Sequence, residues 1–463
     1  MKNYLQNVLQ PKYRRLLFAF GLYMYFYLEA EILFTNRIGE RFGESNGTMF
    51  YGLFCLAAAV GFFSFAFLRR LTPRAEKFFL LILSGAGIIF TTATVYTGAM
   101  ATAALTLLTM LIAGIAGASL LYAMAINVKE KSVLGLFIAL PYAAAFLVQY
   151  MIGYISPLFG GNEVLFLHGS IAAALCAATV FSSKAVTIPM QKHEITIDKS
   201  TETRRYLIGV MIAGLIIFSL YGMMDGIIMT LHVGQELNVY VWVRLLCIPG
   251  LLFTGWIFDL RGGRYFPFAS AIGMAAAVAA VFLFNTADTF NAALGSIYFF
   301  CSFMTMYSLA VFVHVADKTN APAFWAGAGR GLKYLAGGIF ALAGSLIFSH
   351  ISLLLLALIY IALLIALFII LFFQGKLTPV EAKDKTTESP SDIPLEESMK
   401  SYGFTGREID VLRLLLAGKS TFEIAEAMFI TEKTVQKYIS SMMSKTDSKS
   451  RSSLITIFTG NKI

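Results

Sequence analysis

The sequence predicts an all-α protein in two parts: a polytopic membrane bundle of about twelve helices, followed by a small four-helix domain. Of the 463 residues, 58% are hydrophobic and 14% are charged, against about 25% charged in an ordinary soluble domain. Many apolar stretches reach the roughly 20 residues that a helix needs to cross a bilayer. From Phe404 onward the sequence instead places apolar and polar residues on opposite helical faces.

The apolar stretches of spanning length begin near residue 16 and recur as far as residue 373. The first is too long for a signal-peptide core and has no small-residue cleavage site after it, so we expect it to be retained. A short Gly/Ala/Thr run joins the third stretch to the fourth, so the number of spans is about twelve. The expected spans are residues 16–37, 48–68, 78–98, 101–126, 132–157, 163–183, 206–230, 239–258, 266–286, 290–315, 322–349 and 351–373.

Lysine and arginine residues are distributed unevenly over the loops between these spans. With the N-terminus inside, the outer loops carry Arg37 and Arg41 and almost no other base. The inner side carries Lys2, Lys12, Arg14, Arg15, Arg69, Arg70, Arg74, Lys77, Lys129, Lys131, Lys184, Lys192, Lys199, Arg204, Arg205, Arg261, Arg264 and Lys318. Bases are enriched in cytoplasmic loops, so we expect both the N-terminus and the C-terminus to be cytoplasmic.

The longest polar break inside the membrane part, residues 184–205, divides the spans into halves at 1–183 and 206–375. After the eighth span the chain reads GWIFDLRGGRY. Its Gly255, Asp259, Arg261, Gly262, Gly263 and Arg264 match the G-x-x-x-D-x-x-G-R-R-like motif of the major facilitator superfamily, which residues 1–375 resemble. The corresponding stretch of the first half, GFFSFAFLRRLTPR, has Phe65 in place of the acid. The motif implies a short turn whose acid and bases pair with one another and with neighbouring helix ends.

Residues 376–400 are rich in Pro, Ser, Thr, Glu and Lys, and we expect them to form a solvated linker. Residues 401–463 follow as a separate domain. Within it, Thr405 with Glu408 and Ser420 with Glu423 have the spacing of helix capping boxes. Thr431 is a suitable N-cap for a third helix, and a fourth is expected from about Arg451 to Thr459.

The third of these helices, TEKTVQKYISSMMSK, has one apolar stripe and one polar face. Its apolar positions, Val435, Ile439, Met442 and Met443, follow helical spacing. The opposite face carries Lys433, Gln436, Lys437, Ser440, Ser441 and Ser444. Two short helices and a tight turn that lead to a polar, cationic helix form a helix-turn-helix pattern, which suits phosphate neutralisation and base-edge contact.

This C-terminal domain resembles the LuxR-type (GerE, FixJ output) DNA-binding domain of bacterial regulators. The residues in register are Phe404, Thr405, Arg407, Glu408, Val411, Leu412, Leu414, Leu415, Gly418, Ser420, Glu423, Ile424, Ala425, Ile430, Thr434, Val435, Lys445 and Arg451. Gln436, Tyr438 and Thr446 depart from the family pattern, which bears on base preference and phosphate contact. The resemblance implies that the helix after Thr431 enters the major groove and that the last helix pairs with a second copy. The expected DNA contacts are Lys433, Thr434, Gln436, Lys437, Tyr438, Ser440, Ser441, Lys445, Lys449 and Arg451.

Ionisable residues inside the membrane spans are costly and usually face the interior of a bundle. Glu29, Glu31, Asp225 and Arg244 are the candidate residues for a ligand cavity, which would suit a small amphipathic, cationic or proton-linked ligand. The alternative is a structural pair, such as Asp225 with Arg244 or an acid with Arg330. Arg330 and Lys333 are also compatible with a position near the inner surface.

Two functions fit these parts. In the first, a membrane-bound one-component regulator senses a small molecule and binds double-stranded promoter DNA, as a dimer through the helix-turn-helix domain. In the second, a secondary transporter of the facilitator type carries a regulatory DNA-binding tail. Both place the chain in the lipid bilayer of the bacterial cytoplasmic membrane. The sequence has no nucleophile–base set, phosphate loop or metal-spaced cluster, so we expect neither an enzyme nor a cofactor or metal site.

Overall fold

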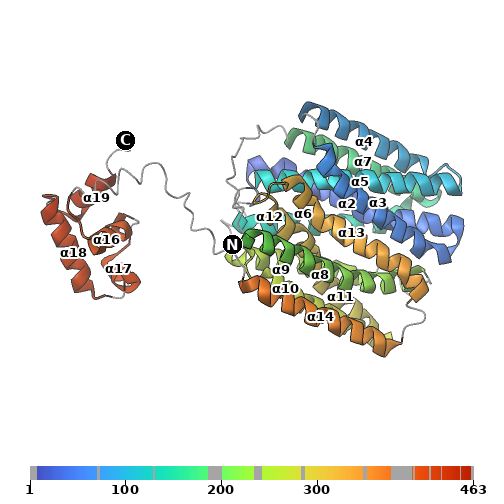
Figure 1. Ribbon diagram of the computed structural model, residues 1–463. Coiled ribbons are helices and arrows are strands. Elements are labelled where there is room, and N and C mark those ends of the chain that lie inside the picture. Colours follow the sequence, from blue (N-terminus) through green and yellow to red (C-terminus); the bar gives the residue numbers. More distant parts are fainter. Residues whose placement is uncertain are drawn as a thin grey trace. The chain divides into compact units, whose positions relative to one another are not determined.

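The computed structural model describes residues 8–69, 73–128, 131–185, 201–233, 242–282, 287–347, 352–376, 399, 402–416, 419–428, 430–448 and 450–459. The chain divides into two compact units, Met1–Thr378 and Pro379–Ile463, here called the membrane unit and the C-terminal unit. The regular structure of the described residues is entirely helical (Figure 1).

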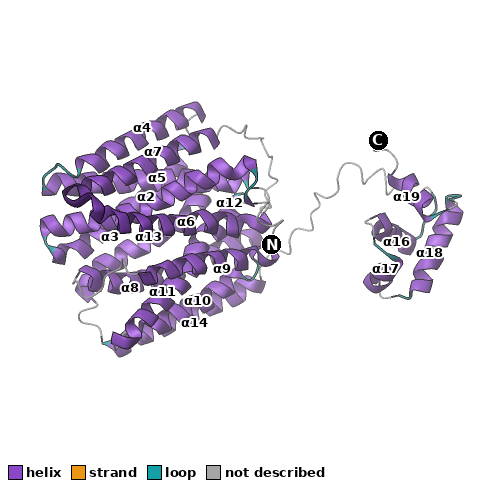
Figure 2. Ribbon diagram, turned by 180° about the vertical axis from the view of Figure 1, so that it is seen from behind, coloured by secondary structure: helices purple, strands orange, loops and turns teal. Residues whose placement is uncertain are grey.

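The membrane unit is a bundle of long helices, with α4 at one edge and α14 at the opposite edge (Figures 1 and 2). Its first half contains α2 (Pro11–Phe42), α3 (Glu44–Leu68), α4 (Pro73–Ala93), α5 (Ala99–Asn127), η1 (Lys131–Val133), α6 (Leu134–Ile155), η2 (Ser156–Asn162) and α7 (Glu163–Ala185). Its second half contains α8 (Thr201–Val233), η3 (Trp242–Leu246), α9 (Cys247–Asp259), η4 (Leu260–Gly263), α10 (Phe266–Val281), α11 (Ala287–Met306), η5 (Tyr307–Val311), α12 (Phe312–Ala316), α13 (Pro322–Ile347) and α14 (Leu353–Lys376).

Each expected span overlaps a helix of this bundle, and α11, η5 and α12 together occupy the tenth span. By length and composition, the described residues contain eight segments that are able to cross a membrane. One of them, Leu134–Ser182, contains α6 and most of α7, whereas Leu80–Ala93 and Phe266–Val281 are shorter apolar helices. The chain is therefore a multi-pass membrane protein, and the number of twelve spans stays a prediction.

The halves meet most extensively where α3 packs along α13 and where α6 packs along α9. At the second crossing Gly135 of α6 faces Gly255 of α9, and a Cβ atom on Gly135 would overlap the carbonyl oxygen of Gly255. Small residues let membrane helices approach with their backbones in contact. The absence of a side chain at Gly135 therefore sets how closely the halves meet here.

The acid of the GWIFDLRGGRY motif lies at the same crossing. The two carboxylate oxygens of Asp259 accept hydrogen bonds from the backbone N–H groups of Gly135 (2.6 Å) and Leu136 (2.8 Å). These donors belong to the first turn of α6, where backbone N–H groups have no partner inside the helix and the helix dipole favours an anion. The acid of the motif thus binds a neighbouring helix end, which is one part of what the resemblance implied.

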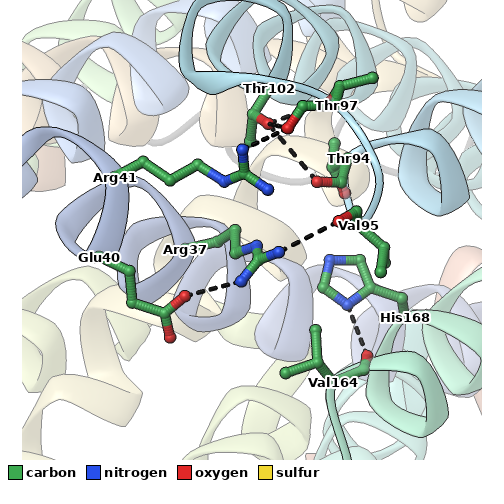
Figure 3. Close-up of polar contacts among 9 residues, drawn as sticks. All are labelled: Arg37, Glu40, Arg41, Thr94, Val95, Thr97, Thr102, Val164 and His168. Atoms are coloured by element: carbon green, nitrogen blue, oxygen red, sulfur yellow. Dashed lines mark hydrogen bonds and ion pairs between the residues drawn. The ribbon is translucent and has the colours of Figure 1, made fainter. Parts of the chain in front are cut away.

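At the far end of α2, two arginines bind the turn between α4 and α5 (Figure 3). Arg37 Nη2 donates to the carbonyl of Val95 (3.1 Å), and Arg41 Nη1 donates to the carbonyl of Thr97. Arg37 Nη1 also donates to Glu40 (2.8 Å). The carbonyls follow the last turn of α4, where basic side chains satisfy groups that lack intrahelical partners. These two bases therefore hold α2 to the α4–α5 turn.

The C-terminal unit contains α16 (Gly406–Leu416), α17 (Thr421–Met428), α18 (Glu432–Lys445) and α19 (Arg451–Thr459) around their own apolar core. Both capping boxes form: Thr405 N donates to Glu408 and Ser420 N donates to Glu423, each at 2.7 Å. Met399, which the sequence assigned to the linker, is 1% exposed and belongs to this core. The rest of the predicted linker after Lys376 lies outside the described residues.

Candidate functional site

Helix α18 separates an apolar face from a polar one, as its sequence predicts. Val435, Ile439 and Met442 are buried in the core of the C-terminal unit. The exposed side chains of the opposite face include Lys433, Gln436, Lys437 and Ser440. Thr431 caps the helix, because its hydroxyl accepts a hydrogen bond from Thr434 N at 3.3 Å. The result is an exposed surface with two lysines and hydrogen-bonding side chains, which we call the α18 face.

Two predicted contacts lie at the border of the α18 face. Thr434 is half-buried, and its hydroxyl is 2.9 Å from that of Thr431 in the N-cap. Tyr438 is also half-buried, and it packs against the apolar core. Gln436 is thus exposed on the α18 face, whereas part of Tyr438 serves the packing of the domain.

Two further predicted contacts, Ser441 and Lys445, bind Glu408 of α16. Ser441 Oγ donates to one carboxylate oxygen of Glu408 (2.6 Å), and Lys445 Nζ donates to the other (2.7 Å). Lys445 also donates to the carbonyl of Gly403 (2.9 Å). Burial of Glu408 acts to raise its pKa, but the hydrogen bonds from Lys445, Ser441 and Thr405 outweigh burial and hold the pKa at about 2. Ser441 and Lys445 thus hold α18 against α16.

Arg451 has a comparable role at the start of α19. Its guanidinium donates to the carbonyl of Lys419 (2.8 Å) and to the hydroxyl of Thr421 (3.1 Å). These bonds attach α19 to the first turn of α17. Of the ten predicted DNA contacts, Ser441, Lys445 and Arg451 therefore stabilise the domain internally, and Lys449 lies outside the described residues.

The membrane unit contains a cavity of about 110 Å³ where helices of both halves converge. Three of the four predicted residues line it: Glu31 of α2, Asp225 of α8 and Arg244 of η3. The full lining is Leu28, Glu31, Ile32, Tyr51, Tyr142, Phe146, Tyr221, Met224, Asp225, Ile228, Arg244, Cys247, Leu251, Ile297, Tyr298, Cys301, Ser302, Met304, Thr305, Arg330, Lys333 and Tyr334. The cavity is thus aromatic and contains charges of both signs.

Glu29 does not line the cavity. Its carboxylate accepts a hydrogen bond from Gln149 Nε2 of α6 at 3.0 Å, and both side chains are buried. An α-helix turns about 100° per residue, so Glu29 and Glu31 point in widely different directions from α2. The sequence analysis predicted that both acids line one cavity, whereas in the structure only Glu31 lines it.

Asp225 accepts two hydrogen bonds, from the hydroxyl of Tyr51 (2.6 Å) and from the hydroxyl of Tyr221 (3.0 Å). Among the described residues, no ion pair joins Asp225 to Arg244 or a cavity acid to Arg330. The two pairs named in the alternative interpretation are therefore not formed, and the ligand role of the cavity residues stays a prediction. Tyrosine hydroxyls, rather than a base, satisfy this carboxylate.

Sequence reasoning also missed the two bases that α13 contributes to the cavity. Arg330 and Lys333 are 2% and 6% exposed and line it, so they do not lie at the inner surface. Arg330 donates to the hydroxyl of Tyr142 (3.1 Å), and Lys333 Nζ lies 4.1 Å from the centre of the Tyr334 ring. The signal in the sequence was their spacing of three residues, which puts both on one helical face next to Tyr334.

Comparison with known proteins identifies the C-terminal unit. Residues 403–458 match the family of bacterial regulatory proteins, luxR family. The DNA-binding transcriptional activator EvgA of Escherichia coli (strain K12) is 42% identical over 67 residues, 14% of this chain and 33% of EvgA. The spore germination protein GerE of Bacillus subtilis (strain 168) is 47% identical over 51 residues, 11% of this chain and 69% of GerE. The chain therefore belongs, through its C-terminal unit, to the luxR family of bacterial regulatory proteins.

The chain spans about a third of the length of EvgA, and all of this similarity lies in a small part of the chain. The solved structure of the nucleoside transporter NupG is 13% identical to this chain, with a TM-score of 0.44. That comparison covers 79% of this chain and 99% of the transporter chain.

Proposed function

We propose that the protein is a membrane-bound one-component transcription regulator, in which the membrane unit senses a small molecule and the C-terminal unit binds promoter DNA. The observation that carries the proposal is the α18 face, with Lys433, Gln436, Lys437 and Ser440 exposed on a luxR-family domain. Lysines neutralise phosphates, and amide and hydroxyl groups contact base edges and backbone. A sensor and an output on one chain need no partner protein between them.

The sensing part of the proposal rests on the cavity of the membrane unit. Its lining comes from both halves, since Tyr51 and Tyr142 belong to the first half and Asp225, Arg244 and Arg330 to the second. A ligand that contacts both halves binds one arrangement of them more tightly than another and shifts the population toward it. The distribution of lysines and arginines supports a cytoplasmic position for the C-terminal unit, where it has access to DNA.

The direct test is the double substitution Lys433→Glu and Lys437→Glu in the full-length protein. We expect it to abolish both promoter response and occupancy of chromosomal DNA, measured by a reporter gene and by genome-wide chromatin immunoprecipitation. The bound sites would also name the regulated genes. Unchanged occupancy by the double variant would reject the α18 face as the DNA-binding surface.

A second candidate function is a secondary transporter that carries a regulatory DNA-binding tail. It is favoured by the cavity between the halves and by Asp259, which binds the start of α6 across them. The two functions differ in their response to the double substitution. Loss of substrate uptake with normal transcription would support the transporter and reject the regulator, whereas loss of transcription alone supports the regulator.

A further inference from the structure

The bases of α13 have an unusual environment for buried cations. Arg330 Cζ lies 5.4 Å from the ring centre of Tyr142 and 5.3 Å from that of Tyr334. Lys333 Nζ lies 5.1 Å from the ring centre of Tyr221. Within the described part of the chain, neither base has a carboxylate within ion-pair distance. Aromatic faces attract cations but do not neutralise them.

The acids of the cavity compensate for only part of its positive charge. Asp225 is engaged by the hydroxyls of Tyr51 and Tyr221, at 2.6 and 3.0 Å. Glu31 is the other acid in the lining, which contains three bases in all. A buried charge is costly unless a group of opposite charge accompanies it. With two acids against three bases, the lining carries an excess of positive charge, and two of the three bases belong to α13.

We propose that the cavity binds a small organic anion, whose carboxylate is held by Arg330 and Lys333. The inference rests on the proposed sensing function and specifies the class of its ligand. A guanidinium presents five N–H donors in a planar fork, and the described contacts of Arg330 within hydrogen-bonding distance are Tyr142 Oη and Met24 Sδ. Arg330 therefore has donors left for a carboxylate, which it binds in a two-pronged geometry.

The size of the cavity and the side chains that line it further restrict the class of ligand. Its volume of about 110 Å³ is somewhat below that of an apolar cavity of about 150 Å³ that accepts benzene. Aromatic rings of Tyr142, Phe146 and Tyr298 form part of the wall and suit the apolar portion of the ligand. The ligand is thus a compact acid with a short aliphatic body, and a single aromatic ring is the upper limit of its size. This class replaces the cationic ligand that the acids alone suggested from the sequence.

The test compares probes of matched shape and different charge on the purified full-length protein in lipid nanodiscs. Propionate and benzoate are the anions, propionamide and benzamide their neutral counterparts, and propylammonium and benzamidinium the cations. Tryptophan fluorescence reports the melting temperature at constant ionic strength. We expect a saturable rise in melting temperature with the anions, because a ligand that binds the folded state stabilises it, and no saturable rise with the other probes.

Substitutions of the two bases of α13 locate the site. Arg330→Gln should weaken carboxylate binding at least about tenfold, because it removes hydrogen bonds to a charged group. Arg330→Lys should retain part of the affinity. Lys12→Gln is the control, since Lys12 lies 4.5 Å from the ring centre of Tyr13 and outside the cavity lining. It removes a lysine–tyrosine contact and should bind carboxylates as the wild type does. Lys333→Gln tests the second base in the same way and also serves if Arg330→Gln does not fold.

The proposal is overturned if the anions do not stabilise the wild type, or if amides or cations stabilise it as much. Unchanged carboxylate affinity in both Arg330→Gln and Lys333→Gln would also overturn it. If both variants fail to fold, the comparison of anionic, neutral and cationic probes on the wild-type protein still decides the class of ligand. Carboxylate binding without any effect on a promoter in cells would support the anion site and reject the sensing function instead.

Discussion

The hydroxyl of Tyr51 donates a hydrogen bond of 2.6 Å to the carboxylate of Asp225, and this bond joins α3 of the first half to α8 of the second. Both side chains line the cavity. The hydroxyl of Tyr221, one turn before Asp225 in α8, completes the coordination at 3.0 Å. A ligand in the cavity is therefore in contact with a hydrogen bond that joins the halves. A ligand that changes this bond can alter how the two halves are arranged.

Tyr51→Phe removes this link without changing the shape of the ring. We expect the membrane unit to lose about 1–3 kcal/mol of stability, because a buried carboxylate loses one of its donors. The ligand response of a promoter should shift as well, since the balance between arrangements of the halves depends on the bond. Thermal unfolding in nanodiscs and reporter dose–response curves measure the two effects.

Tyr360→Phe is the matched control for Tyr51→Phe. Tyr360 of α14 is fully buried, and among the described residues its hydroxyl has no hydrogen-bond partner. Removal of that hydroxyl therefore breaks no bond, and we expect stability equal to or above that of the wild type. Equal losses in both variants would show that Tyr51 acts only through packing.

The α18 face makes a quantitative prediction about salt. If Lys433 and Lys437 each neutralise one phosphate, Lys433→Ala and Lys437→Ala should each reduce the slope of log affinity against log salt by about 1. The measurement needs no known operator, because a random-sequence duplex and full-length protein in nanodiscs suffice. Arg407→Ala is the control, since Arg407 is exposed on α16 rather than on α18. Equal slopes in all variants would contradict phosphate contact by the two lysines.

Glu408 makes the stability of the C-terminal unit depend on pH. Its pKa is about 2 in the folded chain, against an ordinary value of 4.5. The unfolded chain therefore takes up the proton first as the pH falls. The stabilisation is present in full above about pH 4.5 and is lost as the pH approaches 2. Glu408→Gln should cost about 2 kcal/mol near neutral pH and should flatten this dependence.

The measurement is the urea concentration at which the C-terminal unit of the full-length protein becomes sensitive to pepsin, determined from pH 2 to 5. Hydrogen exchange of peptides from α16 and α18 gives the neutral-pH comparison. Glu423→Gln is the control: Glu423 occupies the same capping-box position, and hydrogen bonds from Ser420 lower its pKa too, but its side chain is exposed. A flat profile in the wild type would refute the role of Glu408.

The helical architecture and the C-terminal unit were predictable because they depend on local pattern. Capping boxes such as Thr405 with Glu408 satisfy backbone groups within four residues, and the stripe of Val435 and Ile439 follows the helical repeat. The match to the family pattern added the expectation that α18 enters the major groove of DNA. The hydrogen bonds of Ser441 and Lys445 could not be predicted from local pattern, because their partner Glu408 is more than 30 residues away in the sequence.

The cavity shows a different limit of sequence reasoning. Acids in membrane spans are easy to recognise in a sequence, so Glu31 and Asp225 were correctly predicted to line the cavity. Glu29 was predicted with them, but its carboxylate binds Gln149 instead. Arg330 and Lys333 were not predicted to line the cavity, because a lysine or arginine near the end of a span can also extend its charged group to the membrane surface. Their burial depends on the packing of α13 against α3 and α8, which pairs residues distant in sequence and cannot be inferred from periodicity.

The α6–α9 crossing offers a test of packing with an internal control. A Cβ atom at Gly135 would overlap the Gly255 carbonyl and come within 2.9 Å of Phe258 Cβ, so Gly135→Ala must push α6 and α9 apart. It also sits where Gly135 N binds Asp259. We expect a loss of about 1–3 kcal/mol, measured by thermal unfolding of the full-length protein. Gly153→Ala lies in the same helix with no atom within 4 Å of its Cβ position. It should be neutral or stabilising, because alanine favours helix over glycine. Comparable losses in both variants would mean that close contact with α9 is not the cause of the effect.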